Sequence, residues 1–121
     1  QTYKELKKPL NSMEKLEDIK LTWRTKVNNE LKKDYKKVYK LIDYLIFLKV
    51  PSFKYVYKWR LLQENKLMAK SSGKKIMDSS KIKKFIMFYE RITKNMLKNL
   101  NDYDAVISID KKHRLKKIIF N

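Results

Sequence analysis

The chain has 121 residues, enough for one compact domain, and 31 Lys and Arg against 13 Asp and Glu give it a formal charge of +18. One Gly and two Pro exclude a turn-rich β-sandwich and glycine-rich phosphate loops, and the lack of Cys excludes disulfides, thiol catalysis and cysteine-ligated metals. The charge predicts a polyanionic partner: nucleic acid, an anionic membrane or an acidic glycoprotein.

The first half of the chain predicts an arm followed by helix. Residues 1–11 are polar, contain Pro9 and predict an extended arm. Apolar residues then recur at steps of three or four from Met13 to Leu45, the pattern of an amphipathic helix. The periodicity leaves two forms open, one long helix or two helices that break near Asn28–Asn29. Pro51 ends this run.

Two further helices are predicted before an ambiguous tail. Ser52 is a capping residue type, and the helix after it ends at residues 71–73. A third helix begins near residues 78–80 and ends at 99–102. In the tail, Val106–Ile109 and Ile118–Phe120 resemble short strands. An isolated hairpin is marginally stable, so a short helix with coil stays equally open.

The predicted fold class is therefore all-α: an up-and-down bundle of four to five helices with an extended N-terminal arm and an irregular C-terminal tail. The chain is interpreted as a single domain over residues 1–121, with the arm at 1–11, the bundle at 12–103 and the tail at 104–121. Because it begins at Gln1, we expect either a processed protein, most simply one that has lost a signal peptide, or a fragment. The longest apolar stretch, Tyr44–Leu48, is too short to cross a bilayer.

Residues suited to catalysis are scarce. His113 is the single histidine, lies between Lys112 and Arg114, and is expected to be a solvated surface side chain. No second His and no Cys accompany it, so neither a metal site nor a catalytic triad has its components. Most carboxylates neighbour lysines, which suits helix-surface ion pairs. The sequence thus predicts a protein that is not an enzyme and has no cofactor.

Basic and apolar side chains are the candidate binding residues. Lysines cluster along one helix face and around a loop and helix start, and a third basic group (Lys111, Lys112, Arg114, Lys116 and Lys117) lies in the tail. Apolar residues that fall off the core stripe indicate surface available for association. The predicted basic binding residues are Lys32, Lys33, Lys36, Lys37, Lys40, Lys74, Lys75, Lys81, Lys83 and Lys84. The predicted apolar binding residues are Tyr44, Phe47, Leu48, Tyr55 and Tyr57.

Several local features, taken in order, resemble the abalone sperm lysin family. They are Tyr3 with Pro9–Asn11, Tyr55 and Trp59 before a helix that ends at 69–73, and Phe88–Tyr89 with Lys94–Met96 and Tyr103. Lysine in place of arginine, and an opening of Gln1-Thr2-Tyr3, make the chain more similar to the fusagenic acrosomal paralogue than to lysin itself.

The resemblance implies a secreted, non-enzymatic protein of the sperm acrosomal vesicle, released at the acrosome reaction, that binds anionic membrane lipid and promotes sperm–egg membrane fusion. One alternative is a lysin-like protein that opens the egg vitelline envelope by stoichiometric binding to an egg-surface glycoprotein. A second alternative, from the charge and the helix–Pro–helix arrangement around Pro51, is a nucleic-acid or ribosome-binding protein. Nucleic acid is the less favoured partner, and a homodimer stays open.

Overall fold

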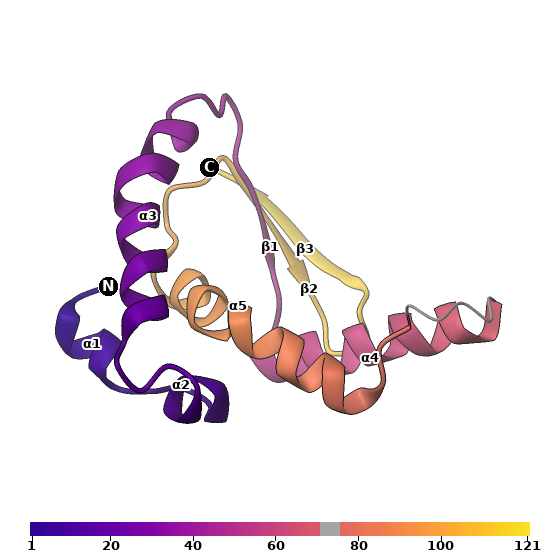
Figure 1. The fold of residues 1–121 in the computed structure, drawn as a ribbon. Helices are drawn as coiled ribbons and strands as arrows, with labels where there is room; N and C mark the ends of the chain where they lie inside the picture. Colours follow the sequence, from indigo (N-terminus) through magenta and orange to yellow (C-terminus); the bar gives the residue numbers. More distant parts are fainter. Residues whose placement is uncertain (71–75) are drawn as a thin grey trace. The chain divides into compact units, whose positions relative to one another are not determined.

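The computed structural model describes residues 1–70 and 76–121 and has a mixed α/β architecture (Figure 1). The element order is α1 (Tyr3–Lys7), α2 (Ser12–Leu16), α3 (Thr22–Tyr39), β1 (Ile46–Lys49), α4 (Phe53–Lys70), α5 (Ser79–Asn99), β2 (Ala105–Ile109) and β3 (Leu115–Phe120). The chain divides into two compact units, which we call unit 1 (Gln1–Tyr44) and unit 2 (Leu45–Asn121).

Unit 1 is built around the buried guanidinium of Arg24 in α3. Its Nη1 donates to the backbone oxygen of Leu6 at 3.0 Å, its Nη2 to that of Asp18 at 2.7 Å, and its Nε to the Asp18 carboxylate at 2.9 Å. The Glu14 carboxylate lies 3.7 Å from Nη1. One side chain of α3 thus contacts α1, α2 and the turn between α2 and α3.

The Asp18 carboxylate also fixes where α3 begins. Leu21 occupies the N-cap position with a left-handed φ of 63° and makes no side-chain cap. Asp18 takes over that role, since it accepts the backbone N–H groups of Trp23 at 2.9 Å and Arg24 at 3.1 Å. Burial alone would raise the pKa of Asp18, but these two hydrogen bonds and the guanidinium outweigh it and hold the pKa below 3.8.

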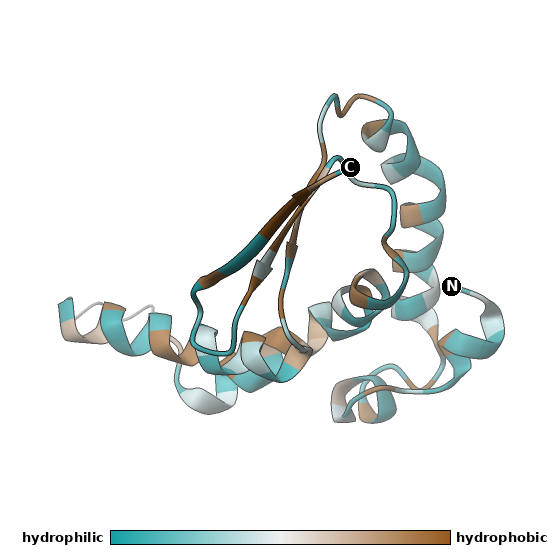
Figure 2. Cartoon of the chain, turned by 180° about the vertical axis from the view of Figure 1, so that it is seen from behind, coloured by the Kyte–Doolittle hydropathy of each residue, from teal (hydrophilic) through white to brown (hydrophobic). Residues whose placement is uncertain are grey.

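Unit 2 contains a three-stranded sheet and two long helices. The strand order is β1-β2-β3; β1 runs parallel to β2, and β2 runs antiparallel to β3. The crossover from β1 to β2 consists of α4 and α5, and their facing stripes bury Ile82, Ile86 and Tyr55. In the sheet, Phe47, Ala105 and Val106 are buried, and the Phe47 ring lies 5.8 Å from that of Tyr103. The strands are largely apolar, as their brown colour shows (Figure 2).

The prediction of an all-α bundle is wrong, because three segments form a sheet. Residues 46–49, predicted as helix, pair with residues 105–108, and the backbone N–H of Leu45 donates to the Asp104 carboxylate at 2.7 Å. An apolar run this short has no decisive periodicity, so the distant partner strand decides its conformation. The tail is not irregular: β2 and β3 form a hairpin, and β1 pairs with β2 and supplies the support that an isolated hairpin lacks.

The N-terminal half also differs from its prediction. The expected extended arm contains the short helix α1, which a capping box between Thr2 and Glu5 stabilises. The apolar run from Met13 to Leu45 breaks at residues 17–21 and again after Tyr39, and α3 continues through Asn28–Asn29. In contrast, α5 begins after Asp78, whose side chain caps it, so this predicted start is confirmed. The predicted helix end at 71–73 lies outside the described residues.

Candidate anion-binding site

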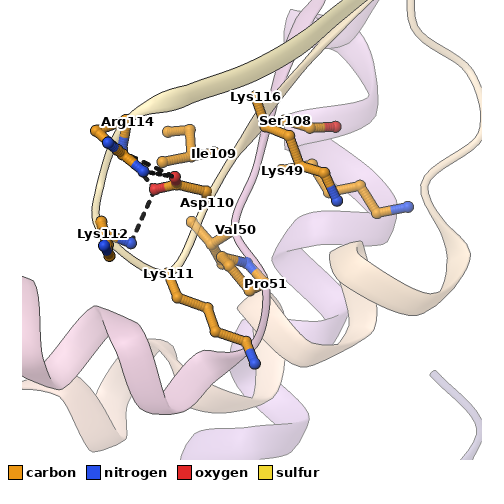
Figure 3. Close-up of a pocket in the computed structure, with 10 residues that line it drawn as sticks. All are labelled: Lys49, Val50, Pro51, Ser108, Ile109, Asp110, Lys111, Lys112, Arg114 and Lys116. Carbon is orange, nitrogen blue, oxygen red and sulfur yellow. Dashed lines mark hydrogen bonds and ion pairs between the residues drawn. The ribbon is translucent and has the colours of Figure 1, made fainter.

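A basic pocket lies where the parallel strands β1 and β2 end. Lys49 is the last residue of β1 and pairs with Ser108 of β2. The cavity has a volume of about 500 Å³, within the range of about 300–1,000 Å³ usual for small-molecule sites. It is lined by Lys49, Val50, Pro51, Ser108, Ile109, Asp110, Lys111, Lys112, Arg114 and Lys116 (Figure 3).

A β-bulge places Lys116 in this lining. The antiparallel register pairs Ser108 with Lys117 and Ile109 with Leu115, so Lys116 is an extra residue with no partner across the ladder. Bulges of this kind redirect a side chain and are frequent beside functional sites. Figure 3 shows Lys116 beside Ser108 and Lys49, so two ammonium groups and a hydroxyl gather at the sheet end.

The turn between β2 and β3 is organised by Asp110. Its Oδ1 accepts the backbone N–H groups of Lys112 at 2.8 Å and Arg114 at 2.9 Å. Its Oδ2 accepts Nε and Nη2 of Arg114, both at 3.2 Å. The backbone hydrogen bond from Arg114 does most to hold the pKa of Asp110 below 3.8, and the bonds from Lys112 and the guanidinium act in the same direction. The pocket's one carboxylate is therefore fully engaged.

The charge that remains in the pocket is positive. Of its five cationic residues, Arg114 is paired with Asp110. The other four are Lys49, Lys111, Lys112 and Lys116, and none of them forms an ion pair within residues 1–70 and 76–121. Four ammonium groups around a cavity with no free carboxylate attract an anion and neutralise it.

An aromatic pair lies on the other side of the same turn. The rings of His113 and Trp59 stack with centroids 4.3 Å apart and an angle of 13° between their planes. His113 has a left-handed φ of 62°, and its N–H donates to the Asp110 backbone oxygen at 3.0 Å. The turn thus holds the imidazole against α4, and the residue is exposed, as expected. The aromatic pair borders a second cavity, of about 600 Å³, which shares Val50 with the basic pocket.

The structure distributes the predicted basic residues over both units. Lys32, Lys33, Lys36 and Lys37 are exposed on α3, and Lys40 follows it. Lys81, Lys83 and Lys84 are exposed on α5, whereas Lys74 and Lys75 lie outside the described residues. None of the described members of the prediction lines the basic pocket.

The predicted apolar residues differ in their exposure. Phe47 and Tyr55 are buried, Tyr57 is half-buried, and Tyr44 and Leu48 are exposed. Tyr57 and the predicted Lys83 line a groove between α4 and α5. The basic group of the tail was recognisable in the sequence, but Lys49 and Ser108 were not among the predicted residues. The signal that would have added them is the apolar run before Lys49, interpreted as a strand parallel to 105–109.

Comparison with protein-family models, with curated proteins and with solved structures finds no match. Within the described residues, no helix has the length and apolar character needed to span a membrane. The described part of the chain also brings no three His, Cys, Asp or Glu residues together as metal ligands.

Proposed function

We propose that unit 2 binds a small phosphate-bearing ligand at the carboxyl ends of β1 and β2. The observation that carries the proposal is the pocket there, in which Lys49, Lys111, Lys112 and Lys116 face no free carboxylate. In open α/β sheets, ligands bind in the crevice outside the carboxyl ends of the strands. The ligand's charge is met by side chains, since no glycine-rich loop is present.

The surroundings favour a ligand that carries a ring beside its phosphates. The cavity next to the basic pocket contains the Trp59–His113 stack and the apolar side chains of Val50, Val56 and Leu62. A nucleotide has this combination of a planar apolar part and a charged part. Nucleic acid offers the same chemistry, but a pocket of about 500 Å³ matches a single nucleotide better than a strand.

The test is a titration of the whole chain, followed by calorimetry, with ATP, inorganic tripolyphosphate, adenosine and a single-stranded RNA. We expect ATP to bind more tightly than tripolyphosphate, and adenosine to bind weakly. If the RNA binds far more tightly than ATP and loses affinity steeply as salt is added, the ligand of this site is nucleic acid and not a nucleotide. No binding of either phosphate compound would overturn the proposal.

Two neighbouring lysines of β3 provide a matched pair of variants. Lys116 lines the pocket and Lys117 does not, although both are exposed on the same strand. Lys116→Gln removes a charged donor worth about 1.5–3 kcal/mol, so ATP affinity falls by roughly tenfold to a hundredfold. Lys117→Gln leaves the affinity nearly unchanged. Equal losses in the two variants would mean that charge attracts the ligand without a defined pocket.

A second candidate is the adhesion to anionic membrane expected from the sequence. It is favoured by β3, in which Leu115, Ile118, Ile119 and Phe120 are exposed next to Lys116 and Lys117. Apolar and cationic groups together are what binding to anionic lipid needs. Leakage from phosphatidylserine vesicles, reduced by Phe120→Ser and absent with neutral vesicles, would support it. The setting in sperm–egg fusion and the non-enzymatic character stay predictions.

A further inference from the structure

The groove between α4 and α5 is a third cavity, with a chemistry of its own. Its volume is about 320 Å³, and it shares no residue with the basic pocket at the sheet end. Residues 53, 54 and 57 line it from α4, and residues 83, 86, 87 and 90 line it from α5. These spacings of three and four place each set on one stripe of its helix, so the two stripes face a common space.

The floor of the groove is apolar and its rim is basic. Phe53, Tyr57, Ile86 and Met87 supply rings and methyl groups, and Ile86 is 8% exposed. The cations are Lys54 and Lys83, which are exposed and form no ion pair within residues 1–70 and 76–121. The Lys54 ammonium lies over the Tyr55 ring, with Nζ 5.4 Å from the centroid.

The one carboxylate of the groove is already neutralised. Glu90 Oε1 accepts a hydrogen bond from Lys94 Nζ at 2.5 Å. The same ammonium lies 5.7 Å from the centroid of the Phe53 ring, which also lines the groove. A cationic ligand would thus find no free counter-charge, whereas an anionic group would meet Lys54 and Lys83.

From this arrangement we infer that the groove binds a small amphipathic anion, an apolar chain or ring that ends in a carboxylate. The apolar part lies on Phe53, Tyr57 and Met87, and the carboxylate lies between Lys54 and Lys83. A volume of about 320 Å³ is at the lower limit of small-molecule sites and is too small for a docked helix, so the ligand is a small molecule.

The first experiment compares octanoate, octanol and octylammonium on the whole chain labelled with ¹³C at its five methionine methyl groups. Met87 is the methionine that lines the groove. We expect octanoate to shift the Met87 signal most, octanol to bind more weakly, and octylammonium to leave the signal in place. The inference would be overturned if octylammonium bound as tightly as octanoate. It would also be overturned if octanoate shifted other methionine signals and left the Met87 signal unchanged.

The second experiment uses variants that keep both helices intact. Lys54→Gln with Lys83→Gln removes the rim cations, and octanoate affinity falls roughly threefold to thirtyfold, as expected for two exposed ion pairs. The matched control is Lys58→Gln with Lys81→Gln, because these two lysines are exposed on the same helices and do not line the groove. An equal loss in both double variants would show attraction to overall charge and would overturn the inference. Tripolyphosphate binding is unaffected by either pair.

Discussion

The two units of the chain are stabilised by different kinds of buried groups. Unit 1 buries three polar residues, Glu14, Arg24 and Asn28, against two apolar ones, whereas the buried residues of unit 2 are mainly apolar. A buried hydrogen-bonded cluster loses much of its stability when one partner is removed, because the remaining polar groups stay buried without a hydrogen bond. An apolar core loses stability in proportion to the volume removed. Arg24 therefore has no substitute in unit 1, whereas the stability of unit 2 is divided over many side chains.

Each unit contains one tryptophan, which allows its unfolding to be followed separately. Trp23 lies in α3 of unit 1, and Trp59 lies in α4 of unit 2. The variant Trp59→Phe therefore reports on unit 1 through Trp23, and Trp23→Phe reports on unit 2 through Trp59.

The largest effect is expected from Arg24→Met, which keeps the volume of the side chain and removes its donors. Loss of the guanidinium removes one buried partner each from the Glu14 and Asp18 carboxylates and from the Leu6 oxygen, at a cost of about 3–5 kcal/mol. Urea unfolding monitored at Trp23 then shifts to lower concentration, while the Trp59 transition stays in place. The control is Lys26→Met, an exposed residue of the same helix. An unchanged Trp23 transition would contradict the role given to Arg24.

A smaller effect is expected from Ile82→Ala in unit 2. Ile82 has no exposed surface, so its truncation costs about 2–5 kcal/mol, depending on how far the cavity closes. The Trp59 transition reports the loss. Met68→Ala on α4, where the side chain is 56% exposed, changes stability by no more than about 0.5 kcal/mol. Similar losses in the two variants would mean that α4 and α5 do not enclose a common core.

The smallest effect is a dependence on pH in unit 1. Because folding lowers the pKa of Asp18 below 3.8, its stabilising contribution is fully present above that value and disappears as the pH falls through the folded pKa. Asp18→Asn removes this part of the acid sensitivity of the Trp23 transition below pH 4. The pKa of the half-buried Asp110 is lowered in the same direction in unit 2, so Asp110→Asn affects the Trp59 transition alone. Identical acid profiles in wild type and Asp18→Asn would contradict this assignment.

The parts of the fold that the sequence predicted are those set by local contacts. The helix α5 follows from the Asp78 cap and the apolar stripe through Ile82 and Ile86, all within a few turns. The strand β1 could not be found in the same way, because Ile46–Lys49 becomes a strand only through pairing with residues 105–108. The apolar periodicity from Met13 to Leu45 is helical, so residues 46–49, which follow it directly, were predicted as part of the same helix.

The candidate site was predictable only in part, for the same reason. Lys111, Lys112, Arg114 and Lys116 lie close together in the sequence and stood out as a basic group. Lys49 joins them only because β1 is parallel to β2. The stack of His113 on Trp59 depends on a turn whose geometry Asp110 determines, and a single histidine between two cations gave no sign of it.

The parallel pairing of β1 with β2 has a consequence for how the chain is made. Leu45 and Asp104, which lock the start of this pairing, are 59 residues apart. During synthesis the N-terminal part leaves the ribosome first. The apolar strand β1 therefore has no partner strand until α4, α5 and β2 have also been synthesised. Closure of such a long loop is slow, and local helices form ahead of it. A nascent chain halted before residue 105 would therefore present an unsatisfied strand to chaperones.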